Sequence, residues 1–345
     1  MAQKSIINIK ELAAKLNLSV TTISRVLNGK ARQYRISKET EKKVQEAAKA
    51  LHYSPNQFAR GLKLDKSETI GVIVPDISNP FFAEIMRSIE EKSKKNGYAV
   101  LIGNSGDNTE QEMILMDHFQ SKKVDGIVVA PVGITSKHLE DLFQGGIPVV
   151  IIDRAFPGTS LPTVTSDNYG GAYQATLQLL QNNHRKIACL QGLKKSQPNI
   201  ERVRGFHDAM KDHHIPDEDY AVAGNQFSIK SGYRMSKRLL ESKQPPTAFF
   251  TLSNLIALGV LQAVYELSLA IPEHVSLISF DEQAYSAFLN TPMTTIEQNK
   301  KKMGRIAVRK LIAQINKEDN DSEFFVRVKT KLHERKSIKK LKIHK

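Results

Sequence analysis

From Thr69 onward the sequence alternates short apolar runs with longer amphipathic segments, and this alternation restricts the fold more than any other feature. Strands that alternate with helices are typical of parallel sheets covered by helices on both faces. The apolar runs are TIGVIV, YAVLIG, VDGIVVA, VVIID, TVT, IACLQG, PTAFFT and VSLISF, and helices are expected from near Pro80, Thr109, Ser136 and Ile200 and over LIALGVLQAVYEL. The pattern restarts beyond Asp167, so it predicts an α/β body of two doubly wound lobes.

The composition is that of a protein with more than one domain. The chain has 345 residues, of which 40% are apolar and 25% charged, too many residues for one core and too apolar for disorder. No apolar run reaches the ~20 residues of a membrane span, and the N-terminus lacks the apolar segment of a secretory signal. The single cysteine, Cys189, excludes an internal disulfide. We therefore expect a cytoplasmic protein with no membrane contact, structural metal or cofactor.

The net charge of +14 is concentrated at the two ends of the chain. Residues 1–66 hold 14 Lys/Arg against 5 Asp/Glu, and residues 327–345 hold 9 against 1. Such segregation indicates a polyanionic partner at one end or both. For the C-terminal run the alternative, a solubilising basic tail, is favoured, because a charge run alone is a weak signal.

The basic N-terminal segment has the pattern of three short helices. Ile9, Leu12, Ala13 and Leu16 form one apolar stripe, and Ser19 and Ser37 are suited to cap the two helices that follow. The tight turn between the first two helices predicts a helix-turn-helix.

The second of these helices carries short or basic residues on its outer face, beginning at its N-terminus. They are Val20, Thr21, Thr22, Ser24 and Arg25. A helix that enters the major groove needs such residues, because its first turns must approach phosphates and base edges. The alternative is an ordinary solvated helix face, since short motifs match by chance.

The segments IKELAAKLNLSVTTISRVLNG and RISKETEKKVQEAAKALHYSPNQFARGL resemble the DNA-binding headpiece of the lactose/galactose repressor (LacI/GalR) family. The resemblance implies DNA contacts from Ser19, Val20, Thr21, Thr22, Ser24, Arg25, Asn28, Arg35, Asn56, Ala59 and Leu62. One departure is the segment GKARQYRI after Asn28, which is longer than the family's usual loop and adds Lys30, Arg32 and Arg35. We expect these cations to contact phosphates.

The stretch YSPNQFARGLKLDKS predicts a helix of only about seven residues, which is marginal in water without a partner. The resemblance implies that this hinge helix forms when two protomers lie side by side in the minor groove, with Leu62 as the wedge between base steps. The alternative is an ordinary linker with one exposed leucine.

The body shows no motif for catalysis. No G-x-G-x-x-G follows a strand, and neither a phosphate-binding loop nor a G-x-S-x-G turn is present. The pair His213–His214 lies in a polar loop and is expected to be solvated. We therefore expect no enzyme, no metal site and no cofactor. A ligand is expected instead at the carboxyl ends of the strands, in the cleft between the lobes.

The segments PDISNPFFAEI, VDGIVV, IPVVIIDR, ERVRGF and SFDE extend the resemblance to the family's effector domain, whose fold is that of periplasmic sugar-binding proteins. The resemblance and the strand-end positions imply effector contacts from Phe82, Asp153, Arg154, Arg202, Asn254 and Asp281. Asn254 stands where many members have an aspartate. The alternative for each residue is a structural role at a strand end.

The sequence thus predicts a helix-turn-helix headpiece (1–54), a hinge helix (55–66), a two-lobed effector and dimerisation domain (67–330) and a basic tail (331–345). The lobes are assigned to 67–165 plus 294–322 and to 166–293 plus 323–330. We interpret the chain as a homodimeric transcription regulator, most simply a repressor, that binds a double-stranded DNA operator and responds to a sugar or related metabolite. The alternative is a solute-binding receptor with no regulatory role.

Overall fold

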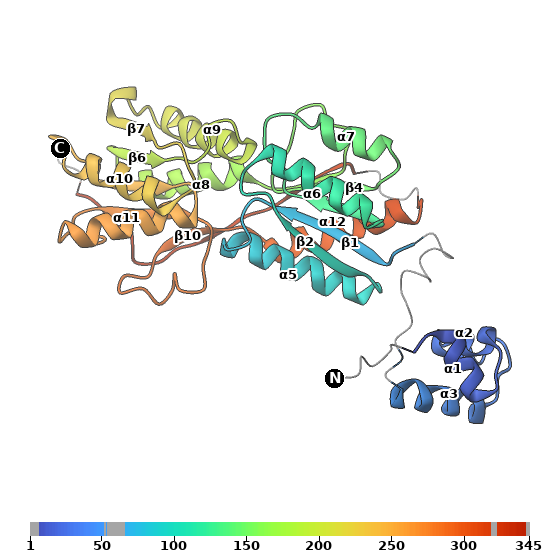
Figure 1. The fold of residues 1–345 in the computed structure, drawn as a ribbon. Helices are drawn as coiled ribbons and strands as arrows, with labels where there is room; N and C mark the ends of the chain where they lie inside the picture. Colours follow the sequence, from blue (N-terminus) through green and yellow to red (C-terminus); the bar gives the residue numbers. More distant parts are fainter. Residues whose placement is uncertain (1–6, 52, 54–65, 319–322, 343–345) are drawn as a thin grey trace. The chain divides into compact units, whose positions relative to one another are not determined.

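The computed structural model describes residues 7–51, 53, 66–318 and 323–342 (Figure 1). The chain divides into two compact units, Met1–Ser67 and Glu68–Lys345. Among the described residues no helix is long and apolar enough to cross a membrane.

The first unit is the predicted helix-turn-helix. Its helices are α1 (Ile9–Leu16), α2 (Val20–Leu27) and α3 (Lys38–Ala50). Ser19 and Ser37 are the N-caps of α2 and α3, and each side chain accepts a hydrogen bond from a backbone N–H one turn on. Leu12, Ile23 and Val44, one from each helix, are fully buried against one another. The capping serines and the apolar stripes therefore act as the sequence predicts.

The second unit contains two six-stranded sheets, one in each lobe (Figure 1). The first sheet is entirely parallel, in the order β11-β5-β4-β3-β1-β2. Its strands are β1 (Thr69–Val74), β2 (Ala99–Asn104), β3 (Gly126–Val129), β4 (Val149–Ile152), β5 (Thr163–Ser166) and β11 (Phe325–Val328). The apolar runs of the inner strands β1, β3 and β4 are buried on both faces, as parallel sheets require, whereas the edge strand β2 is largely exposed.

The second sheet has the corresponding order β12-β10-β9-β8-β6-β7, with only β12 antiparallel to its neighbour. Its strands are β6 (Ile187–Leu190), β7 (Tyr220–Ala223), β8 (Ala248–Thr251), β9 (Ser276–Phe280), β10 (Thr294–Glu297) and β12 (Lys331–His333). The predicted pair of doubly wound lobes is confirmed. Strands β7 and β12 were not expected from the sequence.

Helices cover both sheets (Figure 1). Those of the first lobe are α5 (Pro80–Lys95), α6 (Thr109–Ser121), α7 (Lys137–Gln144) and α12 (Lys300–Ile315); those of the second are α8 (Asn168–Gln181), α9 (Gln197–Asp212), α10 (Ile229–Leu240) and α11 (Asn254–Glu266), with a short 3-10 turn at Asp217–Asp219. Gly205 lets α9 pack closely on α8, because a Cβ there would lie 2.4 Å from the Tyr169 carbonyl oxygen. This packing fixes the helix that carries Arg202.

The chain passes between the lobes three times. For two of these passages the crossing point predicted from the sequence is wrong. The passages lie between β5 and α8, between β10 and α12, and between β11 and β12. Strand β10 pairs with β9 of the second lobe, so residues 294–297 do not belong to the first lobe. Strand β11 pairs with β5 of the first lobe, so its assignment to the second lobe is also wrong. In both cases the chain crosses after the strand rather than before it.

The predicted basic tail (331–345) is instead part of the second lobe over its described residues. Strand β12 pairs antiparallel with β10, and Arg335 forms two hydrogen bonds with the Glu282 carboxylate. Ser337 is fully buried, and its hydroxyl donates to the Leu277 carbonyl. The described part of this segment is therefore packed against the second lobe, and the prediction of a solubilising basic tail is wrong there.

Candidate functional site

The exposed side of α2 carries two hydroxyls that are hydrogen-bonded to each other and two side chains that project into solvent. The Ser19 hydroxyl accepts from the Thr22 N–H at 3.0 Å and lies 2.9 Å from the Thr22 hydroxyl. Val20, 41% exposed, and Thr21 project to solvent beside them. The first turn of α2 therefore presents short side chains whose backbone is fixed by its own cap.

The last turn of α2 is joined to the segment that follows it. The Asn28 side-chain amide donates to the Ser24 carbonyl at 2.7 Å and to the Ser24 hydroxyl at 3.3 Å. The guanidinium carbon of Arg25 lies 3.8 Å from the ring centroid of Tyr34. Arg35, exposed in the same segment, has a positive φ of 53°. Asn56, Ala59 and Leu62 lie outside the described residues.

In the second unit, a buried cleft collects five of the six predicted effector residues. Its lining includes Phe82, Asp153, Arg154, Arg202 and Asp281. Phe82 comes from α5, Arg202 from α9, and the other three follow the strands β4 and β9. Both lobes therefore contribute, as expected for a site at the carboxyl ends of two parallel sheets.

Asp153 and Asp281 occupy equivalent places in the two lobes. Each directly follows the third strand in its sheet order, β4 or β9, and each has a positive φ, 68° and 75°. Both side chains are nearly fully buried. A left-handed backbone is uncommon outside glycine and costs energy, so two such aspartates in one cleft are candidates for a functional role.

Arg202 is held by neutral acceptors rather than by a carboxylate. Its Nε donates to the Asn168 side-chain oxygen at 2.8 Å, and its Nη1 donates to the Leu252 carbonyl at 2.6 Å. Its guanidinium carbon lies 3.8 Å from the centroid of the Phe280 ring. Burial lowers the pKa of Arg202, and the nearby Asp281 and Asp153 oppose that shift. The guanidinium is thus fixed in place with a donor group left for a ligand.

Arg154 is oriented by the first lobe. Its Nη1 donates to the Pro131 carbonyl at 3.0 Å, and its Nη2 pairs with Asp107 at 2.8 Å. Asp107 also lines the cleft, although the sequence analysis did not select it.

Asn254 does not line the cleft but joins the two lobes beside it. Its amide nitrogen donates to the Asn79 side-chain oxygen at 3.2 Å, and Asn79 is the N-cap of α5 in the first lobe. Its own side-chain oxygen is buried with no partner among the described residues. The contact of Asn254 with a ligand stays a prediction, and in this structure its side chain contacts the other lobe.

The cleft is rich in buried acceptors. Asp281 accepts from the Gln298 amide at 2.5 Å, and the Gln298 side-chain oxygen has no partner among the described residues. Burial raises the pKa of Asp153 to about 6, although Arg154 and Arg202 oppose the rise. The lining thus holds two arginines and four carboxylates, Asp76, Asp107, Asp153 and Asp281, a balance that suits a neutral ligand with several hydroxyl donors.

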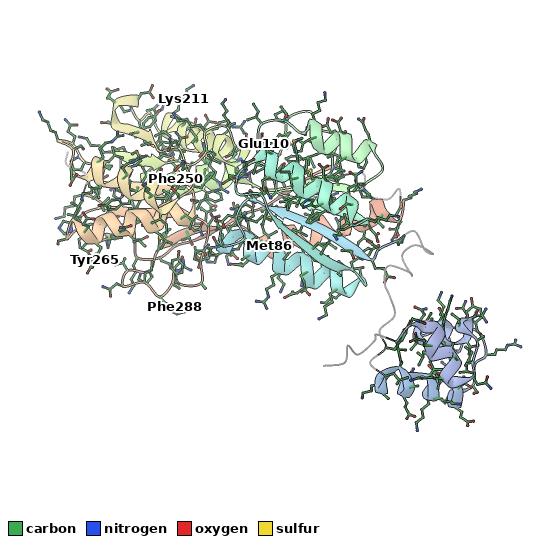
Figure 2. The ribbon with its side chains drawn as sticks, viewed as in Figure 1. Met86, Glu110, Lys211, Phe250, Tyr265 and Phe288 are labelled. Carbon is green, nitrogen blue, oxygen red and sulfur yellow. The ribbon has the colours of Figure 1, made fainter. Side chains whose placement is uncertain are left out.

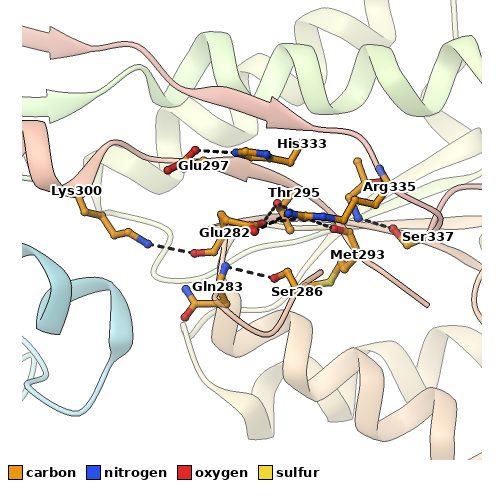
Figure 3. Close-up of polar contacts among 11 residues, drawn as sticks. Glu282, Gln283, Ser286, Met293, Thr295, Glu297, Lys300, His333, Arg335 and Ser337 are labelled. Carbon is orange, nitrogen blue, oxygen red and sulfur yellow. Dashed lines mark hydrogen bonds and ion pairs between the residues drawn. The ribbon is translucent and has the colours of Figure 1, made fainter. Parts of the chain in front are cut away.

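The residue after Asp281 links the cleft to the first lobe (Figure 3). The Lys300 ammonium, 7% exposed, donates to the Glu282 carbonyl at 3.1 Å and pairs with Glu84 of α5 at 3.0 Å. The Glu282 carboxylate is held by Arg335 at 2.7 and 3.0 Å and by the Thr295 hydroxyl. The lobes therefore share a buried cation that bonds to the residue next to Asp281.

Several lining residues were missed by the sequence analysis, among them Asp107, Ser196, Phe227 and Gln298. Gln298 directly follows β10, so its position after a strand could have selected it. Asp107 and Phe227 lie in loops, and nothing in their local pattern distinguishes them from solvated residues. No group of three potential metal ligands occurs among the described residues.

A helix-turn-helix unit and a two-lobed unit with a polar, aromatic-lined cleft together define a ligand-responsive DNA-binding protein. Residues 8–56 match the family described as bacterial regulatory proteins of the lacI family, and residues 67–337 match periplasmic binding proteins and the sugar-binding domain of the LacI family. The chain is similar to catabolite control protein A of Priestia megaterium, with 32% identity over 92% of this chain and 95% of the relative. It is also similar to the transcriptional repressor PurR of Histophilus somni, with 33% identity over 96% and 99%.

A solved LacI-family regulator from Enterococcus faecium with bound ribose superimposes with a TM-score of 0.72, at 28% identity over 79% of this chain and all of that one. The chain belongs to the LacI family and is a DNA-binding transcription regulator. The comparisons confirm a regulator rather than an enzyme, and the LacI-type headpiece argues against a receptor without a regulatory role.

Proposed function

We propose that the protein is a repressor whose operator affinity is set by a neutral, polyhydroxylated small molecule, sugar-like in chemistry, bound between its lobes. The observation that carries the proposal is the convergence of Asp153, Asp281 and Arg202 in one buried cleft. Carboxylates accept from vicinal hydroxyls while a guanidinium donates to them. The ribose bound by the regulator from Enterococcus faecium supports the same ligand class.

Aromatic side chains give the cleft an apolar wall. Phe82 lies edge-on to Phe81, with ring centroids 5.0 Å apart, and Phe227 lines the cleft from the second lobe. A sugar ring has an apolar face that such rings cover. A phosphorylated ligand is disfavoured, because Asp107, Asp153 and Asp281 would repel its charge.

The contacts between lobes offer a route from ligand to DNA. A ligand that draws Asp281 and Asp153 together changes the angle between the lobes, which strains the Asn254–Asn79 and Lys300–Glu282 hydrogen bonds. Hinge motion of this kind alters the spacing of attached domains. We propose that it controls how the headpieces and residues 55–66 meet the operator in the cytoplasm.

A homodimer is proposed from the operator geometry of helix-turn-helix proteins and from exposed apolar side chains. Ile102 on the edge strand β2 is 56% exposed, and Met113 and Ile114 on α6 are 48% and 46% exposed. In the second lobe, Tyr265 and Phe288 extend into solvent at 86% exposure each (Figure 2). A second copy of the chain would cover such exposed apolar side chains if they form a contiguous surface.

The test is a thermal-shift screen of the full-length protein against sugars, sugar phosphates and nucleosides. A ligand at about 100 times its Kd adds about 2.7 kcal/mol of stability to the folded state. We expect a neutral sugar to raise the Tm of the wild type but not of Asp281→Asn, while sugar phosphates have no effect. A hit that stabilises Asp281→Asn equally would contradict the assignment of the cleft.

A further inference from the structure

The segment between α2 and α3 places an aromatic ring against the arginine of the candidate recognition helix. The guanidinium carbon of Arg25 lies over the Tyr34 ring, 3.8 Å from its centroid. Tyr34 belongs to the stretch that is longer than the family's usual loop, and it is 43% exposed. The Tyr34 ring therefore packs against a cation while part of its surface stays in contact with solvent.

The backbone of this segment is folded onto the end of α2. The Lys30 N–H donates to the Arg25 carbonyl at 2.9 Å, and the Tyr34 N–H donates to the Lys30 carbonyl at 3.2 Å. Ala31 is 1% exposed within the headpiece core, and its carbonyl accepts from the Ile36 N–H at 2.9 Å. Backbone hydrogen bonds and the buried Ala31 therefore hold the turn that contains Tyr34, and they fix the position of its ring beside Arg25.

The side chains near Arg25 are cationic, so an aromatic ring, rather than a carboxylate, holds its guanidinium in place. Lys30, Arg32 and Arg35 lie in the same segment, and no carboxylate pairs with the Arg25 guanidinium among the described residues. The ring attracts the cation without occupying its N–H donors. A salt bridge would occupy the same N–H donors that must form hydrogen bonds with a base.

Arginine reads guanine through its edge, with two N–H groups donating to O6 and N7. A guanidinium whose face rests on a ring keeps that edge available and loses less rotamer freedom when it meets the base. We propose that Tyr34 is a positioning residue that holds Arg25 ready for a guanine in the operator. This inference rests on the proposed role of α2 as the element that reads DNA.

The expected effect follows from the strength of such contacts. At exposed sites a cation–aromatic contact changes an equilibrium by about two- to fivefold. Two headpieces bind one operator in the proposed dimer, so the loss compounds to about four- to 25-fold.

The experiment uses full-length protein and the duplex that the wild type selects from a random DNA library. Fluorescence anisotropy measures affinity for this operator, for every single base-pair variant of one half-site and for unrelated DNA. The variants are Tyr34→Leu, Tyr34→Phe, Arg25→Ala and the matched control Gln33→Leu, which introduces the same residue next to Tyr34 in the same loop.

We expect Arg25→Ala to lose discrimination at one guanine position. Tyr34→Leu should lose the predicted factor of about four to 25 in operator affinity and weaken discrimination at that same position only. Tyr34→Phe, which keeps the ring, should restore both, and Gln33→Leu should behave as the wild type.

Three results would overturn the proposal. A wild-type profile for Tyr34→Leu, or tighter operator binding by it, would show that the ring does not position Arg25 for the base. An equal loss on all sequences would assign Tyr34 to phosphate contact or to folding. If Arg25→Ala itself shows no position-specific loss, the DNA interface on α2 fails together with the role of Tyr34.

Discussion

Replacing Arg202 by methionine tests the polar network beneath the cleft. Arg202 is 4% exposed and donates to two buried acceptors, the Asn168 side-chain oxygen and the Leu252 carbonyl oxygen. Methionine occupies much of the same volume but donates no hydrogen bond. The Arg202→Met variant therefore leaves both acceptors buried and unpaired while adding little empty space.

The magnitude follows from those two acceptors. Each buried, unpaired group costs about 1–3 kcal/mol, so the free energy of unfolding should fall by about 2–6 kcal/mol. For a domain of this size each kcal/mol lowers the Tm by roughly 2–4 °C, which predicts a fall of about 4 °C or more. The loss of this cation also raises the pKa of Asp153 further, because Arg202 opposes the effect of burial there.

The assay is thermal unfolding at pH 7.5 without ligand, followed by operator binding with and without the sugar found in the screen. Arg204→Met is the matched control, because Arg204 lies on the same helix and makes an exposed ion pair with Glu201, worth less than about 1 kcal/mol. We expect Arg202→Met to bind operator but not to respond to the sugar. Equal Tm values for the two variants would refute the stabilising role of the network.

Three further predictions concern charge and coupling. Asp153→Asn should flatten the pH dependence of stability, because burial raises the pKa of Asp153 to about 6 and the folded protein retains a proton that the unfolded chain releases above about pH 4. The free energy of unfolding of the wild type should therefore fall by about 3 kcal/mol between pH 4 and 6. The Tm of the variant should exceed that of the wild type at pH 7.5 but not at pH 4.5. A variant that melts in parallel with the wild type at both pH values would contradict this. Arg25→Ala should cost about 1–3 kcal/mol of operator binding per half-site and leave sugar binding unchanged, as gel shift and calorimetry can measure. Lys300→Met should still bind the sugar, but the effect of the sugar on operator affinity should be smaller by about fivefold or more, since the Lys300 ammonium joins the Glu282 carbonyl to Glu84. An unchanged effect of the sugar would exclude Lys300 from the coupling between ligand and operator.

Short-range features of this fold were predictable from the sequence because their physics is local. Ser19 and Ser37 cap the helices that they precede, and the apolar runs of β1, β3 and β4 become strands buried on both faces. Asp153 and Asp281 were also predictable, because the carboxyl ends of parallel strands meet at one edge of each sheet.

Other features depend on contacts between distant parts of the chain. The short strands at Thr294–Glu297 and Phe325–Val328 have similar patterns, and only their pairing with β9 and β5 decides the lobe to which each belongs. Asp107 reaches the cleft through its pairing with Arg154, 47 positions along the chain. Asn254 lies at the predicted strand end, yet its hydrogen bond to Asn79 turns it toward the other lobe.

The most direct test of the account is the affinity of the full-length protein for its selected operator, measured at constant salt with and without a saturating neutral sugar identified by thermal shift. The account predicts a change of about fivefold or more, in either direction, in the wild type, and no change in Asp281→Asn. A sugar that binds the wild type in the cleft and leaves operator affinity unchanged would contradict the claim that the cleft controls the headpiece.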